Sequence, residues 1–204
     1  MRSGIQVQKI KKYIITGGPH SGKSSVITML ESRGIQVLHE TARLLIMEDQ
    51  AKREADPLFK QLYPWEDQQI FCRRCHERQK EREKGLKEGL TVLDRSIIDN
   101  LAYAVVAGIE LDKRIYIDIA DANYERKVFF FELLGQYTMD DQRKDTLEQV
   151  NAVHREIYKA YSGLGFEMIT VPLFSTDMEI NIQKRADMLL DHIMKAFQSI
   201  PGAI

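Results

Sequence analysis

The chain has 204 residues, of which 44% are hydrophobic and 29% charged, a balance typical of a soluble globular protein. Its formal net charge of −1 argues against a nucleic-acid binder that relies on a general basic excess, although a local basic patch stays open. We find no apolar run long enough to span a bilayer and no secretory signal, and we expect a cytoplasmic protein. Residues 12–200 are expected to form one domain, preceded by a flexible lead-in over residues 1–11.

The most informative motif directly follows a short apolar run at residues 12–16. It fits the phosphate-binding pattern G-x-x-x-x-G-K-[ST] at every fixed position, and its residues are Gly17, Gly18, Pro19, His20, Ser21, Gly22, Lys23 and Ser24, followed by Ser25. Its glycines let successive backbone N–H groups point at phosphate oxygens, and the helix that begins here adds its positive N-terminal end. We expect these nine residues to bind ATP or GTP, with Lys23 on the β- and γ-phosphates and the Ser24 hydroxyl on Mg²⁺.

A second apolar run, residues 35–39, is followed by Glu40 and by a helical pattern over residues 41–55. A carboxylate just past a buried strand lies at the edge of a sheet where ligands bind, so Glu40 is a candidate to accept the proton of an attacking hydroxyl. Arg43, one turn further on, is a candidate to neutralise phosphate or to pair with Glu40. The alternative is an ordinary helix start with an acidic first turn.

Residues 65–84 form a charged helical pattern that contains Cys72, Cys75 and His76. Their C-x-x-C-H spacing is that of haem attachment, but no export signal accompanies it, and there is no second Cys/His pair to complete a zinc site. We interpret the cysteines as structural residues of a reduced protein. Five basic residues of this stretch form a possible basic patch, namely Arg73, Arg74, Arg78, Lys80 and Arg82.

The third apolar run, residues 91–94, ends in Asp94 and is followed by Arg95. Beside a phosphate-binding loop, an aspartate at this position can hold Mg²⁺ directly or through water, and Arg95 can contact substrate or phosphate. The alternative is that Asp94 only caps the helix expected over residues 97–107.

Apolar runs at residues 128–132 and 168–171 complete a set of five, and helical patterns over residues 147–161 and 176–197 follow them. Short apolar strands that alternate with helices predict an α/β fold, with a five-stranded parallel sheet covered by helices on both faces. Between the fourth strand and the helix at 147–161, Arg143 is the best candidate for a lid cation and Lys144 the next. His154, beside the apolar stripe of that helix, is interpreted as structural.

The chain resembles a P-loop family of AAA-domain ATP/GTP-binding proteins related to NadR-type ribosylnicotinamide kinases. The resemblance covers nearly the whole chain and rests on the motifs at 17–24, 40–43, 93–96 and 143–145, together with Asp99 and residues 101–103. It implies a P-loop NTPase fold of the nucleoside- and nucleotide-kinase type with a lid. It also implies that Asp94 and Arg95 handle Mg²⁺ and phosphate, that Glu40 faces the acceptor, and that Arg143 closes on the transferring group.

The resulting hypothesis is a Mg²⁺-dependent kinase that moves the γ-phosphoryl group of ATP or GTP to a small hydroxylated acceptor such as a nucleoside. Catalysis would be carried by Lys23, Glu40, Asp94, Arg95 and Arg143, with Ser24 and Asp94 as metal ligands. The alternative is a nucleotide-dependent switch that hydrolyses slowly and acts on a protein or lipid partner. A polynucleotide kinase is disfavoured by the net charge, and no oligomeric state is assigned.

Overall fold

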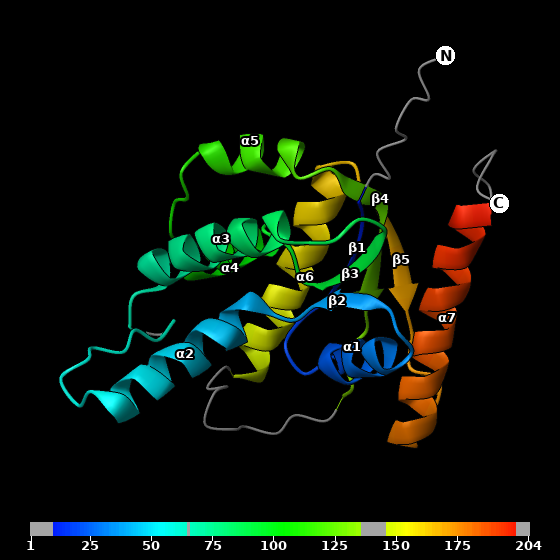
Figure 1. Cartoon of the computed structure of the whole chain (residues 1–204), viewed down its shortest axis with the longest axis horizontal. Coiled ribbons are helices and arrows are strands. Elements are labelled where there is room, and N and C mark those ends of the chain that lie inside the picture. The colour runs from blue at the N-terminus through cyan, green and yellow to red at the C-terminus, as the bar shows by residue number, and fades with distance from the viewer. Residues whose placement is uncertain (1–9, 65, 136–145, 199–204) are drawn as a thin grey trace, which may run out of the picture.

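The protein is described by a computed structural model over residues 10–64, 66–135 and 146–198. Its sheet contains five parallel strands in the order β2-β3-β1-β4-β5 (Figure 1). The strands are β1 (Lys11–Thr16), β2 (Gln36–Leu38), β3 (Leu90–Asp94), β4 (Tyr124–Phe131) and β5 (Glu167–Val171). The predicted α/β architecture with a five-stranded parallel sheet is therefore confirmed.

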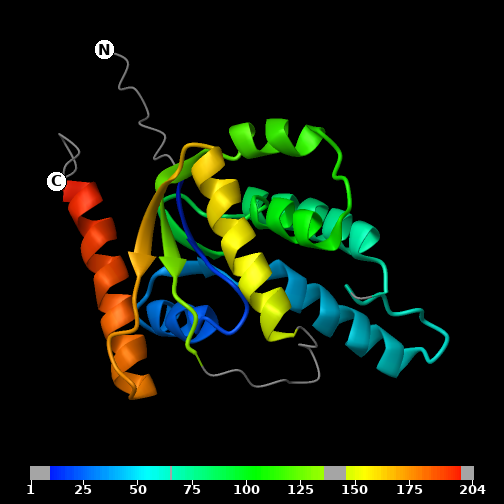
Figure 2. The same ribbon diagram turned by 180° about the vertical axis from the view of Figure 1, so that it is seen from behind.

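Helices connect successive strands and lie on both faces of the sheet (Figures 1 and 2). They are α1 (Lys23–Ser32), α2 (Thr41–Ala55), α3 (Gln68–Lys84), α4 (Asp99–Ala107), α5 (Arg114–Asp121), α6 (Leu147–Gly163) and α7 (Met178–Gln198). Within the described ranges, no helix is both long and apolar enough to cross a membrane.

The side chains of each strand alternate between two apolar cores, one on each face of the sheet. On one face, residues such as Ile15 and Phe129 pack against α1 and α7. On the other face, residues such as Ile14 and Val128 pack against α4, α5 and α6. Because β1, β3 and β4 are buried on both sides, their sequences are almost continuously apolar where the sheet is central. The sheet is thus fixed rigidly, and its carboxyl edge can serve as a platform for a site.

Two elements differ from the sequence-based expectation. Helix α5 was not predicted, because its eight residues are too short to give a long periodic pattern, although Ile115 and Ile119 anchor it in the core. The last helix begins at Met178 and not near residue 176, since the Asp177 carboxylate accepts the N–H groups of Glu179 and Ile180. Asp177 is therefore the residue that caps α7.

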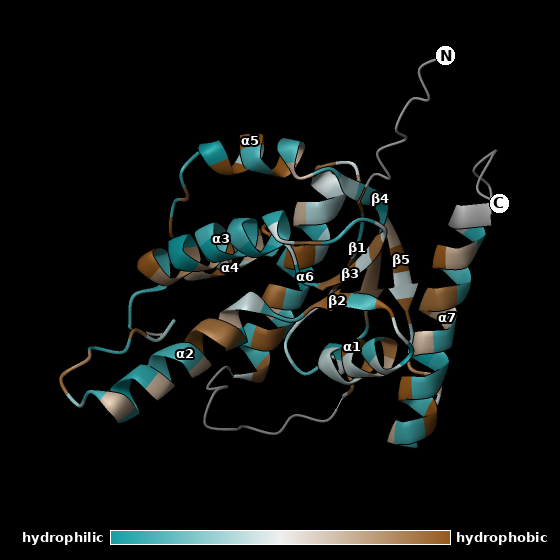
Figure 3. Ribbon diagram, viewed as in Figure 1, coloured by the Kyte–Doolittle hydropathy of each residue, from teal (hydrophilic) through white to brown (hydrophobic). Residues whose placement is uncertain are grey.

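Helix α3 is largely hydrophilic in Figure 3, yet one of its faces is buried. The Glu83 carboxylate accepts hydrogen bonds from Lys12 Nζ and Tyr124 Oη at 2.8 Å and from Gln79 Nε2 at 3.0 Å. These contacts join α3 to the first residues of β1 and β4. The charged second half of α3 is therefore not a uniformly solvated face, because Gln79 and Glu83 point into the protein.

Replacing Glu83 with alanine should lower the free energy of unfolding by about 3–5 kcal/mol, since it leaves the Lys12 ammonium buried without its carboxylate. The measurement is urea unfolding followed by circular dichroism. The matched control is Glu81→Ala on the same helix, whose exposed ion pair with Arg78 should be worth less than about 1 kcal/mol. Equal losses in the two variants would contradict this account of α3.

Candidate active site

The phosphate-binding loop runs from the end of β1 to the first turn of α1, as its motif predicts. Gly17 has φ = 138°, and a Cβ atom there would lie 2.6 Å from the carbonyl oxygen of Phe131. Gly22 has φ = 76° and directly precedes α1. Only glycine takes both positions without strain, so the loop turns tightly and directs its backbone at the start of the helix.

In this loop the Lys23 ammonium is bound by its own neighbours. Its Nζ atom donates to the carbonyl oxygens of Gly17 and Gly18 at 3.1 and 2.9 Å and to Ser21 Oγ at 2.9 Å. Burial, followed by the nearby Arg95 guanidinium, lowers the pKa of Lys23 to about 7. A triphosphate would replace these partners with stronger charge-assisted ones and would restore the cationic form.

The residues expected to hold Mg²⁺ meet across the sheet edge. Ser24 Oγ lies 3.5 Å from Asp94 Oδ2, and Asp94 Oδ1 is buried without a hydrogen-bond partner among the described residues. Burial, with Glu40 next, raises the pKa of Asp94 to about 6. The Ser24 hydroxyl and the Asp94 carboxylate, with its unpaired Oδ1, suit a Mg²⁺ ion that is otherwise coordinated by phosphates and water. The described residues contain no cluster of three or more metal-binding side chains, so any such ion would depend on the nucleotide for most of its ligands.

Asp94 does not cap a helix, contrary to the alternative reading. Helix α4 begins only at Asp99, and the turn before it is closed by Ser96 Oγ, which accepts the N–H of Ile98 at 3.1 Å. The Asp94 carboxylate is thereby left facing Ser24.

Glu40 and Arg95 form an ion pair at the carboxyl edge of the sheet, where the ends of β2 and β3 lie side by side. Arg95 Nε donates to Glu40 Oε1 at 2.9 Å, and Arg95 Nη1 donates to Asp99 Oδ1 at 2.9 Å and to the Gly17 carbonyl at 3.0 Å. The Arg95 guanidinium helps to hold the pKa of Glu40 below its usual value although burial opposes this. Glu40 is therefore an ionised carboxylate, and its side chain does not cap α2.

Asp99 stabilises the arrangement from behind. Besides Arg95, its carboxylate accepts Thr16 Oγ1 and Tyr161 Oη at 2.6 Å and the Ser96 N–H at 3.0 Å. These donors belong to β1, α6 and the turn after β3. A buried carboxylate with every oxygen engaged fixes the loop between β3 and α4, including the left-handed backbone of Arg95 at φ = 70°.

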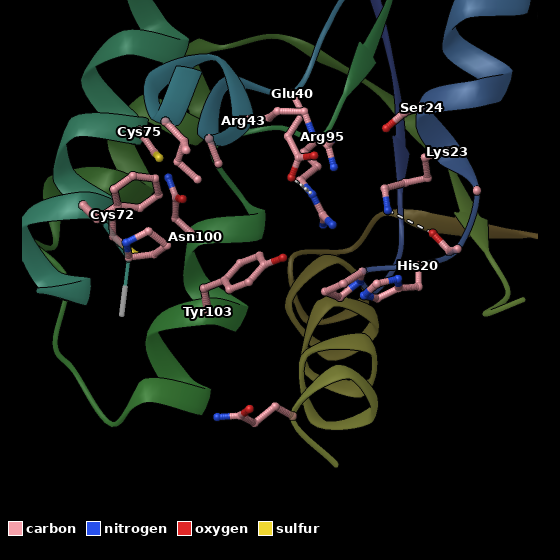
Figure 4. A pocket seen from close by; sticks show the side chains of 18 of the residues that line it. His20, Lys23, Ser24, Glu40, Arg43, Cys72, Cys75, Arg95, Asn100 and Tyr103 are labelled. Atoms are coloured by element: carbon pink, nitrogen blue, oxygen red, sulfur yellow. Dashed lines mark hydrogen bonds and ion pairs between the residues drawn. The ribbon is translucent and has the colours of Figure 1, made fainter. Parts of the chain in front are cut away.

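A single cavity of about 580 Å³ extends from the phosphate-binding loop past Glu40 to a more apolar end between α2, α3 and α4. Figure 4 shows Lys23, Ser24 and His20 on one side, Cys72, Cys75, Asn100 and Tyr103 on the other, and Glu40 and Arg95 between them. The far end is lined by Ile46, Pro64, Gln68, Phe71, Cys72, Cys75, Asn100 and Tyr103. Arg43 also lines the cavity, but the ion pair of Glu40 is with Arg95.

The two cysteines have no disulfide and are buried, and burial raises the pKa of both thiols. The haem and zinc readings gain no support, since His76 points to Asp118 on α5 at 2.7 Å. The thiols nevertheless line the cavity, a role that their sequence pattern did not suggest.

Two histidines lie at the loop. His20, one of the loop residues expected to bind the nucleotide, is partly buried and lines the cavity with φ = 60°. His154, on α6, was interpreted as structural, and its Nδ1 accepts the Gly18 N–H at 3.0 Å while its ring lies 4.4 Å from that of Phe130. His154 therefore supports the outer side of the loop.

Several cavity residues were not singled out from the sequence, namely Gln68, Phe71 and Asn100. They come from two helices distant in sequence, and only the tertiary arrangement brings them together. Arg143 and Lys144, the expected lid cations, lie outside the described residues, as does Trp65.

The profile of a family described as AAA domain matches residues 12–180, so the chain belongs to that family of P-loop proteins. A search of curated proteins found no match.

Solved structures with the same fold include nucleoside and nucleotide kinases. A deoxyadenosine kinase from M. mycoides with dCMP and dCDP superposes with a TM-score of 0.59 at 12% identity, covering 91% of this chain and 99% of that one. Thymidylate kinases from Ehrlichia chaffeensis and Candida albicans give TM-scores of 0.55 and 0.56 at 15% and 13% identity. They cover 90% and 91% of this chain and 98% and 92% of their own. The fold predicted from the sequence is thus that of these kinases, and nothing in the comparisons singles out the NadR type.

His154 should make stability depend on pH. Burial, then the Lys23 and Arg155 charges, lower the pKa of His154 from 6.5 to about 4. Between these values the unfolded chain binds more protons than the folded one, so stability falls as pH drops from 6.5 to 4. His154→Asn keeps an acceptor for Gly18 without this titration, and its thermal midpoint should fall less over that range.

The matched control is His192→Asn, whose ring contacts Phe129 on the opposite face of the sheet. Thermal unfolding of the three proteins from pH 7 to pH 4 measures the difference. If wild type and His154→Asn show the same slope, His154 does not carry this pH dependence.

Proposed function

We propose that this protein is a Mg²⁺-dependent kinase that transfers the γ-phosphoryl group of ATP or GTP to a hydroxyl of a small, nucleoside-type acceptor. The observation that carries the proposal is the continuous cavity, which holds a phosphate-binding loop at one end, a neutral pocket at the other, and the Glu40 carboxylate between them. A nucleotide and an acceptor bound at the two ends would meet at Glu40. Such positioning, together with charge stabilisation, is most of what phosphoryl transfer requires.

Each residue then has a definite task. The loop amides and Lys23 would bind the phosphates. Ser24 and Asp94 would hold Mg²⁺, which would offset the charge that develops on the phosphoryl oxygens. Glu40 accepts the proton as the acceptor oxygen bonds to phosphorus and the bond to the nucleoside diphosphate breaks. Arg95 keeps Glu40 ionised and oriented, and Arg143 is proposed to reach the transferring group from the lid.

The chemistry of the pocket supports a neutral acceptor over a nucleoside monophosphate. Arg95, the cation bonded to Glu40, is already paired with two carboxylates, Glu40 and Asp99. An incoming phosphate would face the Glu40 charge. The far end instead offers the Phe71 ring for stacking, amide groups of Gln68 and Asn100, and the Tyr103 hydroxyl. These groups suit a heterocycle and sugar hydroxyls.

The basic patch that would favour a lipid- or protein-binding switch is largely neutralised. Arg74 forms two hydrogen bonds of 2.8 Å with the Asp49 carboxylate, Arg78 binds Glu48 and Glu81, and Lys80 binds Asp118. Arg82 donates to the carbonyl oxygen of His39 at 2.7 Å. Four of the five cations of the patch are thus bonded to groups of the protein itself and are less available to a lipid or protein partner. This favours the kinase hypothesis over the switch. The free thiols of Cys72 and Cys75 suit a reducing compartment, and we place the activity in the cytoplasm.

The kinase proposal predicts that nucleosides stimulate release of ADP or GDP in the presence of Mg²⁺. The assay pairs ATP and GTP with a panel of nucleosides, nicotinamide riboside included, and with the corresponding monophosphates. Nucleosides should be phosphorylated in preference to monophosphates, and Lys23→Ala should abolish turnover. Tight nucleotide binding without acceptor-stimulated turnover would instead support the switch.

Glu40→Gln should lower kcat by about 10²–10⁴-fold because the amide cannot take the proton, while the KM for the nucleotide changes little. Glutamine can still accept a hydrogen bond from Arg95, so the fold of the site is preserved. The control is Glu48→Gln on the same helix, which pairs with Arg78 away from the cavity. Wild-type kcat in Glu40→Gln would remove Glu40 from the mechanism.

A further inference from the structure

Arg185 is a fully buried cation that the sequence analysis did not single out. It lies on α7, has no exposed surface, and donates only to carbonyl oxygens among its described hydrogen bonds. A buried charge costs several kcal/mol unless it is well paired, so a guanidinium here without a hydrogen-bonded carboxylate needs an explanation. Burial lowers its pKa while the nearby Glu132 charge opposes this, but an arginine remains charged at neutral pH.

The acceptors of Arg185 are the ends of three segments that meet at the carboxyl edge of the sheet. Nη1 donates to the Ser21 carbonyl of the phosphate-binding loop at 2.6 Å. Nη2 donates to the Glu132 carbonyl after β4 at 3.2 Å and to Val171 of β5 at 3.4 Å, and Nε donates to Pro172 at 2.9 Å. The guanidinium also stacks over the Phe131 ring, 5.0 Å from its centroid.

The shortest of these bonds acts on the peptide group between Ser21 and Gly22. In a trans peptide the C=O and N–H bonds point in opposite directions. With the Ser21 carbonyl held by Arg185, the Gly22 N–H is turned to the opposite side of the loop. Ser21 and Gly22 both line the cavity that begins at this loop, so the amide is available to a phosphate oxygen there.

We propose that Arg185 is a positioning residue for triphosphate binding, which fixes the Ser21–Gly22 peptide so that the Gly22 N–H faces the phosphates. Its positive charge lies behind that peptide and adds to the field at the start of α1. The planar guanidinium is essential for this role, because its three nitrogens donate to four carbonyl oxygens at once, which the single nitrogen of a lysine cannot do. This inference rests on the nucleotide binding in the proposed function and not on phosphoryl transfer, so its test requires no acceptor and can fail while the kinase proposal stands.

The test compares Arg185→Lys and Arg185→Met with wild type by titration calorimetry, using ATP, GTP and inorganic tripolyphosphate without acceptor. The dissociation constants should rise about tenfold or more in Arg185→Met, and by an intermediate factor in Arg185→Lys, which keeps the charge without the planar guanidinium. Tripolyphosphate should lose affinity as ATP does, because the effect lies at the phosphates.

Ile193→Ala is the matched control, since it removes a buried side chain from the same helix without touching the loop. It should lower the thermal midpoint yet leave the dissociation constants within about twofold. The amide of Gly22 gives a second readout, because its nitrogen chemical shift and its hydrogen exchange should change in Arg185→Lys and not in Ile193→Ala. If Arg185→Met does not fold, Arg185→Lys alone decides. Wild-type affinity in the folded Arg185 variants, or an equal loss in Ile193→Ala, would overturn the proposal.

Discussion

The ion pair between Glu40 and Arg95 is the interaction on which the site depends. It joins the ends of two neighbouring strands, β2 and β3, and through the Gly17 carbonyl it also reaches the end of β1. Arg95 is buried and Glu40 is partly buried, so the Arg95 charge would be costly without a carboxylate, and Asp99 supplies a further hydrogen bond to it. Glu40 is thereby held as an anion between the phosphate-binding loop and the more apolar end of one cavity.

Much of this site was predictable because parallel strands bring their carboxyl ends to one edge. Glu40 follows one apolar run, Asp94 ends another, and the loop motif follows a third. Once the three runs are placed side by side as parallel strands, these residues are expected to lie close together. Local sequence could not predict the left-handed backbone of Arg95 or its hydrogen-bond partners, since both depend on Asp99 and on residues of other elements. The more apolar end of the cavity likewise lies between α2, α3 and α4, and no local sequence pattern predicts how these helices pack.

Arg185 does carry a signal in the sequence, because it is a charged residue on the apolar face of a helix. It lies three residues before Met188 and four before Leu189, on the apolar stripe of α7 that also contains Ile193. A charged residue at a core position of an amphipathic helix contradicts its pattern, and such contradictions tend to mark functional positions. Helix α5 was not predicted because its eight residues are too few to show a clear helical periodicity.

The hydrogen bonds of Lys23 within the loop bear on how a nucleotide would bind and leave. Because its ammonium is bound by two carbonyls and Ser21 Oγ within the loop, the charge is already removed from water when the chain folds. A bound nucleotide would replace these partners with phosphate oxygens, and its departure would restore them. In the proposed kinase the Lys23 ammonium would thus have hydrogen-bond partners both with and without nucleotide, so release of the product would not leave a buried cation unpaired.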